Sequence, residues 1–145
     1  MAFRISTGLV NAMVQTNSFG TLTSAGFLDL YSGSQPTTAD DAETGTKLCS
    51  ITTTSGTGGL VFGTAASGIL PKSASVWSGV VLASGVAGWF RFYGAGKTTG
   101  TNGTAYRFDG AVGLTGSDLV LTHTSLVKDT TLTIEQFTIT QPKNT

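Results

Sequence analysis

Short segments in which apolar and polar residues alternate make up most of this chain, and they predict β-strands more than helices. Thr, Val, Ile and aromatic residues favour strands, and the abundant Gly and Ser residues lower helix propensity throughout. Eight strands are expected, at residues 26–31, 47–53, 60–62, 75–82, 87–93, 105–114, 118–122 and 131–140. Several short strands in one small domain predict a mostly β fold, an antiparallel β-sandwich or jelly roll of about eight strands.

The strand that contains WFRFY is the most informative of the eight. Phe90 and Phe92 lie on one face of this strand, while Trp89, Arg91 and Tyr93 lie on the other. Because both faces carry aromatic residues, we expect the strand to be central in its sheet, with Phe90 and Phe92 anchoring the core. The second face then needs a cover, which a loop, the N-terminal helix or another chain could supply.

The last predicted strand contains an irregularity. Leu132 and Ile134 point to one side, whereas Phe137 and Ile139 point to the other. A one-residue slip turns every side chain to the opposite face, so a β-bulge near residues 135–136 would reconcile the two pairs. A strand that is covered on both faces explains the pattern equally well, since periodicity does not separate the two cases.

One segment near the N-terminus predicts a short helix with an apolar side. Ser6 or Thr7 can cap a helix through residues 8–14, although Gly8 and the short length weaken it. Its apolar side would consist of Leu9, Val10, Met13 and Val14. We therefore expect a mostly β domain that is preceded by one short helix.

A second helical turn is expected in the acidic segment that follows Pro36. This turn would run into Asp40, Asp41 and Glu43, because carboxylates near a helix N-terminus suit the helix dipole. It would end at Gly45, since glycine commonly ends a helix. The alternative for these acidic residues is a solvated loop.

The predicted elements divide the chain into three parts. We expect an N-terminal arm with the short helix at residues 1–25, a β-sandwich domain at 26–140 and a C-terminal tail at 141–145. The arm and the tail are the parts expected to reach a neighbouring molecule, because unpaired ends are free to order on contact. At 145 residues the chain has the size of one domain and can bury a core without disulfides or metal.

Charge changes this picture more than any other feature of the composition. The chain has 8 basic and 8 acidic residues, so that 11% of its residues are charged and its net charge is zero, against about 25% charged in an ordinary domain. A nucleic-acid-binding protein needs a cluster of Lys and Arg, and none is present. A near-zero net charge promotes association. We therefore expect a protein that packs against neighbours and does not bind nucleic acid.

Cysteine content and hydropathy limit the cellular setting. The single cysteine, Cys49, excludes an intramolecular disulfide and fits folding in a reducing cytoplasm. The N-terminus has no basic-then-apolar signal pattern, and no apolar run approaches the roughly 18 residues of a membrane span. We expect a soluble protein with no membrane partner.

No residue pattern predicts catalysis or a bound cofactor. His123, the only histidine, lies between two threonines at an expected strand end, where a surface role is favoured over that of a catalytic base. One His with one Cys does not supply a usual zinc site. Lys47 shares a strand face with Cys49 and could lower its thiol pKa, but a buried small apolar role is favoured. We therefore predict no catalytic, cofactor-binding or metal-binding residue.

Two further patterns indicate ligand sites only superficially. The acidic residues 40–43 lack the spacing of a calcium loop, and GAGKTTG at residues 94–100 lacks the spacing of a phosphate loop, so a hairpin loop is expected there. Four aromatic residues could form a sugar-stacking platform, although aromatic strand residues normally pack in a core. These four are Trp77, Trp89, Tyr93 and Tyr106.

Six motifs spread over residues 27–140 resemble a pattern that recurs in small structural proteins of tailed bacteriophages. They are YSGSQP followed by AD (31–40), GTKL (45–48), WFRF (89–92), DGAVG (109–113), SDLVL (117–121) and TIEQFTIT (133–140). The resemblance implies a virion component, with a capsid cement or decoration protein as the first expectation. The motifs are structural, and no active-site signature comes with them.

The resemblance and the composition together give the expected function. We predict a non-enzymatic protein of the virion, assembled in the host cytoplasm, with many copies stabilising the capsid shell. Its expected partners are the major capsid protein and copies of itself in a homo-oligomer, and multiple copies would multiply moderate contacts by avidity. The alternatives are a carbohydrate-binding β-sandwich and a tail or fibre module.

Overall fold

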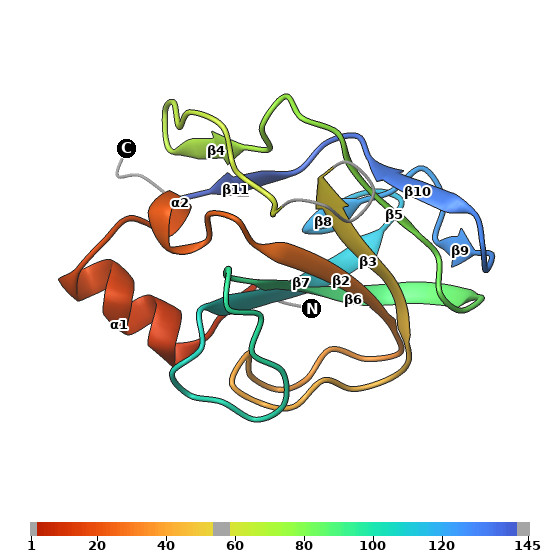
Figure 1. The fold of residues 1–145 in the computed structure, drawn as a ribbon, viewed down its shortest axis with the longest axis horizontal. Coiled ribbons are helices and arrows are strands. Elements are labelled where there is room, and N and C mark those ends of the chain that lie inside the picture. The colour runs from red at the N-terminus through yellow and green to blue at the C-terminus, as the bar shows by residue number, and fades with distance from the viewer. Residues whose placement is uncertain (1–2, 54–58, 142–145) are drawn as a thin grey trace.

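The computed structural model describes residues 3–53 and 59–141, and these residues form two β-sheets and two helices (Figure 1). The helices are α1 (Thr7–Gln15) and α2 (Phe19–Leu22). The strands are β1 (Arg4–Ile5), β2 (Phe27–Ser32), β3 (Lys47–Thr53), β4 (Ile69–Pro71), β5 (Trp77–Val80), β6 (Gly85–Tyr93), β7 (Arg107–Gly113), β8 (Leu119–Val120), β9 (Ser125–Leu126), β10 (Thr131–Ile134) and β11 (Thr138–Thr140).

The larger sheet contains nine of the described strands, and the smaller one pairs β11 with β4. Seven strands of the large sheet follow the order β1-β7-β6-β2-β3-β5-β10, while β8 pairs with β7 and β9 pairs with β6. All of the pairings are antiparallel except the one between β7 and β8. The fold is therefore mostly antiparallel β and sandwich-like with few helices, which confirms the predicted fold class.

β6 lies in the centre of the large sheet, as its aromatic pattern predicts. It pairs with β2 on one side and with β7 on the other, and Phe92 stands opposite both Leu28 and Phe108. Phe90 and Phe92 are fully buried on this face, and Arg91 is fully buried on the opposite one. Strand alternation thus gives the sheet one apolar face and one charged face.

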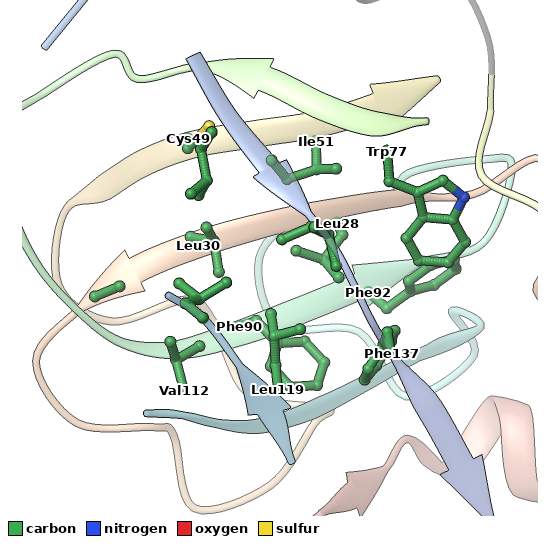
Figure 2. Close-up of a cluster of buried hydrophobic side chains, with 14 of the residues drawn as sticks. Leu28, Leu30, Cys49, Ile51, Trp77, Phe90, Phe92, Val112, Leu119 and Phe137 are labelled. Carbon is green, nitrogen blue, oxygen red and sulfur yellow. The ribbon is translucent and has the colours of Figure 1, made fainter. Parts of the chain in front are cut away.

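The core is built mainly from aromatic side chains on the apolar face. Phe92 stacks on Phe108 with 5.0 Å between ring centroids, and Phe90 meets Phe137 edge-on at 5.4 Å. Figure 2 shows the segment with Phe137 crossing the sheet, with Phe90 and Phe92 between the two layers. Aromatic pairs in such arrangements add to the free energy of burial.

The N-terminal residues belong to the sheet and do not form a separate arm. β1 pairs with β7, and Leu9 and Thr23 are fully buried. The structure thus differs from the predicted boundary at residues 25–26, because a two-residue strand gives almost no periodic signal. Of the predicted tail, Gln141 donates its backbone N–H to the carbonyl of Gly68 at 2.7 Å, and residues 142–145 lie outside the described residues.

α1 confirms the predicted N-terminal helix and its cap. The hydroxyl of Ser6 accepts a hydrogen bond from the Leu9 N–H at 3.3 Å. The buried side of α1 differs from the prediction, because Leu9 and Ala12 are buried whereas Val14 is 83% exposed. α2, which sequence patterns did not predict, has only four residues and begins after Ser18.

The last predicted strand is two strands in two different sheets. β10 pairs with β5 in the large sheet, and β11 pairs with β4 in the small one. The change of direction between Ile134 and Phe137 therefore reflects a crossing from one sheet to the other, with both side chains buried. Neither a bulge near residues 135–136 nor one continuous strand covered on both faces describes it.

The acidic segment after Pro36 forms a turn, so the prediction of a helix there is wrong. The carboxylate of Asp41 accepts hydrogen bonds from the N–H and the hydroxyl of Thr38, at 2.9 and 3.0 Å. Such side-chain bonds compete with helical ones. Gly45 has a φ of 77° and an added Cβ would collide with the carbonyl of Ser32, so glycine is required there.

The other predicted strands match the structure to different degrees. β3 has the predicted bounds, and β2, β5, β6, β7 and β8 lie at or within about two residues of theirs. Residues 60–62 form isolated bridges, from Leu60 to Gly26 and from Phe62 to Lys72, and no named strand. β1, β4 and β9 were not predicted, and each has only two or three residues. Among the described residues, no helix has the length and hydropathy of a membrane span.

Candidate functional site

The charged face of the large sheet carries a buried network that we call the polar layer. Its members come from β2, β6 and β7 and from the loop at residues 33–46. They are Asp29, Tyr31, Glu43, Arg91, Tyr93, Arg107 and Asp109, with Lys47 and Lys97 at the rim. Figure 1 shows the loops at residues 33–46 and 94–106 lying side by side along this part of the molecule. The cover expected over the second face of β6 is therefore provided by loops.

Arg91 and Asp109 form the centre of the polar layer. They stand opposite each other on β6 and β7, and both side chains are fully buried. Two parallel hydrogen bonds join them, from Nε to Oδ1 at 2.6 Å and from Nη2 to Oδ2 at 2.8 Å. Burial alone lowers the pKa of Arg91, but the bonds to Asp109 raise it above its usual value. The pair is thus a bidentate ion pair inside the protein.

Arg107 binds backbone carbonyls of both loops. Its Nε donates to the carbonyl of Ala39 at 2.6 Å and its Nη2 to that of Asp40 at 2.8 Å. Its Nη1 donates to the carbonyl of Thr98 at 2.9 Å in the second loop. Burial and the nearby charge of Arg91 lower its pKa. These bonds also explain why the acidic segment is not a helix, because its carbonyls bind guanidinium groups.

Glu43 joins the two loops to each other and to the sheet. Its Oε2 accepts a hydrogen bond from the N–H of Gly100 at 2.9 Å. Its Oε1 accepts bonds from the Tyr93 hydroxyl at 2.8 Å and from Arg91 at 3.2 Å. Burial alone would raise the pKa of Glu43, but these three bonds hold it below its usual value. Glu43 is therefore ionised at neutral pH and holds the two loops to the sheet.

Asp29 gathers a second set of contacts on β2. It accepts a hydrogen bond from the hydroxyl of Ser50, and the ammonium groups of Lys97 and Lys47 lie 3.1 and 3.9 Å from its carboxylate. Lys97 thus reaches back from the loop at residues 94–106 to the sheet. The run at residues 94–100 is a loop between β6 and β7, as expected, and its lysine is turned inward.

The polar layer is a network of ion pairs and hydrogen bonds that holds parts of the protein together. Each charged group in it has an opposite charge within 4.0 Å, and the hydroxyls of Tyr31 and Tyr93 lie 2.8 Å apart. Burial is the main cause that raises the pKa of both tyrosines, so neither is a base near neutral pH. Buried ion pairs add little over apolar packing, but losing one partner is costly. The polar layer therefore fixes the two loops to the sheet.

A second feature is an open apolar groove on the side of α1 and α2. Its volume is about 890 Å³, and no charged residue lines it among the described residues. Thr140 and Gln141 at the end of β11 also line it. The groove is defined by the apolar residues Phe3, Ile5, Met13, Phe19, Leu70 and Ile139. Pockets of about 300–1,000 Å³ with apolar walls are typical of binding sites.

The structure places the two reactive residues singled out from the sequence in different surroundings. His123 is exposed and its Nδ1 lies 3.1 Å from the hydroxyl of the neighbouring Thr122. Cys49 is fully buried, and burial together with the charge of Asp29 raises its thiol pKa to about 12. Lys47 therefore does not lower that pKa, and the interpretation of Cys49 as a buried small apolar residue is confirmed.

The three acidic residues after Pro36 have separate partners. The carboxylate of Asp40 accepts hydrogen bonds from the backbone N–H and the hydroxyl of Thr7, whereas Asp41 caps its own turn. Glu43 belongs to the polar layer. Among the described residues, no group of three or more His, Cys, Asp or Glu residues is placed to hold a metal.

The four aromatic residues considered as a sugar platform do not form one surface. Trp77, Trp89 and Tyr93 are at most 1% exposed, and Tyr106 is 43% exposed. Trp89 stacks on Tyr31 within the polar layer, with 4.5 Å between ring centroids. The interpretation of these strand aromatics as packing residues is confirmed for the three buried ones.

Sequence patterns missed the residues of the polar layer, although a signal was present. Arg91 stands between two core phenylalanines, and Arg107 and Asp109 share one face of a strand with the same alternation. A charged residue on a strand with aromatics on both faces indicates a buried ion pair. Its partners were not predictable, because register decides which strands and loops meet.

No family model, curated protein or solved structure matches this chain. The resemblance to phage structural proteins therefore stays a prediction.

Proposed function

We propose that this protein is a non-enzymatic structural component of a bacteriophage virion, of the cement or decoration type, which stabilises the capsid shell through many copies. The observation that carries the proposal is where the charges lie. Of its eight basic and eight acidic side chains, seven take part in the ion pairs of the polar layer, and four of these are at most 1% exposed: Asp29, Arg91, Arg107 and Asp109. The outer surface is therefore even poorer in charge than the composition indicates.

Exposed apolar side chains support association with neighbours. Twelve large apolar residues are exposed among the described residues, including Val14, Val76 and Val86 at 83, 60 and 59%. Single exposed apolar residues are ordinary, but here they stand on a surface with little charge to keep copies apart. Such a surface suits tight contact with a protein shell and lacks the basic patch that nucleic acid requires.

The two loops that the polar layer holds against the sheet also support a structural role. Two guanidinium groups and one carboxylate hold the loops at residues 33–46 and 94–106 against the sheet. A rigid surface loses little conformational entropy on binding, and many weak contacts are multiplied when copies bind together. The partners in this proposal are the major capsid protein and other copies of this chain.

The proposal is tested by making particles without the protein. They should assemble but lose genome or shape at lower temperature or weaker osmotic stress than complete particles. Adding the purified protein back to such particles should restore their resistance, which separates a direct effect from an assembly defect. Stripped particles that are as robust as complete ones would remove the cement role.

A further inference from the structure

The hydrophobic core is incomplete along the apolar groove. Eight partly buried apolar residues pack against the core: Phe3, Ile5, Met13, Phe19, Leu22, Leu70, Ala83 and Ile139. Six of them line the groove. The exposed part of the core is thus concentrated in one hollow, which lies between the two helices on one side and the small sheet on the other. Covering it would remove apolar surface from water.

One wall of the groove is a strand with an open edge. Within residues 3–53 and 59–141, β11 pairs with β4 alone, and the bonds from Lys72 to Phe137 and from Gln141 to Gly68 show which residues face β4. Because antiparallel residues alternate, Thr138 and Thr140 turn their N–H and C=O groups to the other edge. Neither residue has a backbone partner there among the described residues. Figure 1 shows β4 on one side of β11 and α2 on the other.

We propose that the groove binds an extended, uncharged segment of another polypeptide, which adds to β11 as a new strand. Unpaired strand edges are templates for such pairing, and apolar pockets beside them receive alternate side chains. Among the described residues no charged side chain lines the groove, which favours a segment without charged side chains, since a buried unpaired charge is costly. The source of the segment rests on the proposed function, which makes it a segment of the shell protein.

The edge distinguishes this occupant from two others. A small apolar molecule would use the volume of the groove but not the backbone groups of Thr138 and Thr140. A second copy of this chain would need to insert a strand of its own, and the variants below would then change the oligomeric state of the free protein. Both alternatives are therefore separate outcomes of one experiment.

The first pair of variants acts on the edge. Thr140→Pro removes the N–H that points to the open edge, while the ladder to β4 keeps its bonds from Ile139 and Gln141. Thr140→Val keeps this N–H and is its control. Thr140 is exposed, so neither change creates a cavity.

The second pair of variants acts on the volume. Gly20 lines the groove, and a Cβ added to it would meet only Leu70 across the groove, at 3.8 Å. The Cβ of Gly20→Leu therefore has room, and the rest of the side chain extends from a residue that lines the groove. Gly103→Leu adds the same side chain where nothing lies within 4 Å, and it is the control for a new exposed leucine.

The measurement is the apparent Kd of each purified variant for shells assembled without this protein, by co-sedimentation. Thr140→Pro should weaken binding by about tenfold, the factor that corresponds to one lost hydrogen bond. Gly20→Leu should weaken binding by about tenfold or more, because its side chain takes space that the segment needs. Gly103→Leu should bind as the wild type does, and Thr140→Val, which keeps the N–H, should bind more tightly than Thr140→Pro. Melting temperatures of the free variants check folding. If Thr140→Pro is unfolded, Thr138→Pro takes its place and is compared with Gly20→Leu.

The other outcomes overturn the inference in distinguishable ways. If only Gly20→Leu weakens binding, the groove takes a side chain or small molecule without strand pairing. If wild type and all variants bind equally, the groove is not used and the cement role still holds. If the wild-type protein does not bind shells at all, both the proposed function and the inference about the groove fail. A changed oligomeric state in free Thr140→Pro would assign the groove to a second copy.

Discussion

The two faces of the large sheet carry different kinds of buried residue: apolar core residues on one face and the charged residues of the polar layer on the other. Phe90 and Arg91 are neighbours in the sequence and both are fully buried. Phe90 meets aromatic rings, whereas Arg91 meets Asp109 and Glu43. The cost of changing either follows from what its side chain touches.

Phe90→Ala tests the apolar anchor. Removing a fully buried phenylalanine should lower the free energy of unfolding by about 3–5 kcal/mol, much of the roughly 5–15 kcal/mol that a typical domain has. Denaturant unfolding measures the change. Val14→Ala, at a position that is 83% exposed, is the control and should change little. An unchanged stability of Phe90→Ala would contradict the assignment of this face to the core.

Glu43→Gln tests the polar layer through the pH dependence of stability. The folded pKa of Glu43 lies below its usual value, so its ionised form stabilises the fold above that usual pKa. This contribution is lost as the pH falls through the lower, folded pKa. At neutral pH the variant should therefore melt at a lower temperature than wild type, and the difference should shrink as the solution is acidified below the folded pKa.

The pH dependence separates the effect of the Glu43 charge from the effect of packing its side chain. Melting curves of both proteins between neutral and acidic pH provide the measurement. A difference in melting temperature that stays constant over this range would show that the charge of Glu43 does not hold the loops.

Elements were predictable where their own sequence decides them. β3 has its predicted bounds because its alternation is regular, and α1 begins at the predicted cap, Ser6. β1 and α2 have two and four residues, too few for a periodic signal. The split of residues 131–140 into β10 and β11 depends on β5 and β4, which are distant in sequence. The polar layer was missed for the same reason, since Arg107 bonds to a loop 67 and 68 residues away.

Gly8 and Gly20 give an element-scale test, because each lies within a helix. Helix propensity alone favours Ala over Gly by up to about 1 kcal/mol. A Cβ on Gly8 would collide with the backbone of Thr104, whereas one on Gly20 meets only Leu70 at 3.8 Å. Gly8→Ala should therefore destabilise the protein by about 1–3 kcal/mol, the usual cost of overpacking.

Gly20→Ala serves as the matched control in the same unfolding experiment and should be neutral or slightly stabilising. Equal effects at both positions would mean that α1 does not pack closely on the loop at residues 94–106. In the structure, that loop also donates the Asn102 N–H to the carbonyl of Asp40, so its position is fixed from two sides.

At the scale of the whole molecule, the fold buries four charged side chains and leaves apolar side chains and an open groove exposed. The polar layer uses seven charged residues to hold two loops on the sheet. The groove exposes six of the apolar residues that pack on the core. A protein of this kind gains stability when a neighbour covers its surface, which is the physical basis of the proposed shell-binding role.

The most direct test of that role is to image intact particles and locate the copies of this protein. Electron cryo-microscopy of complete particles, compared with particles that lack the protein, gives the difference density. The account predicts difference density at many equivalent sites over the capsid shell. Density confined to the tail or its fibres, or absent from the particle, would contradict it.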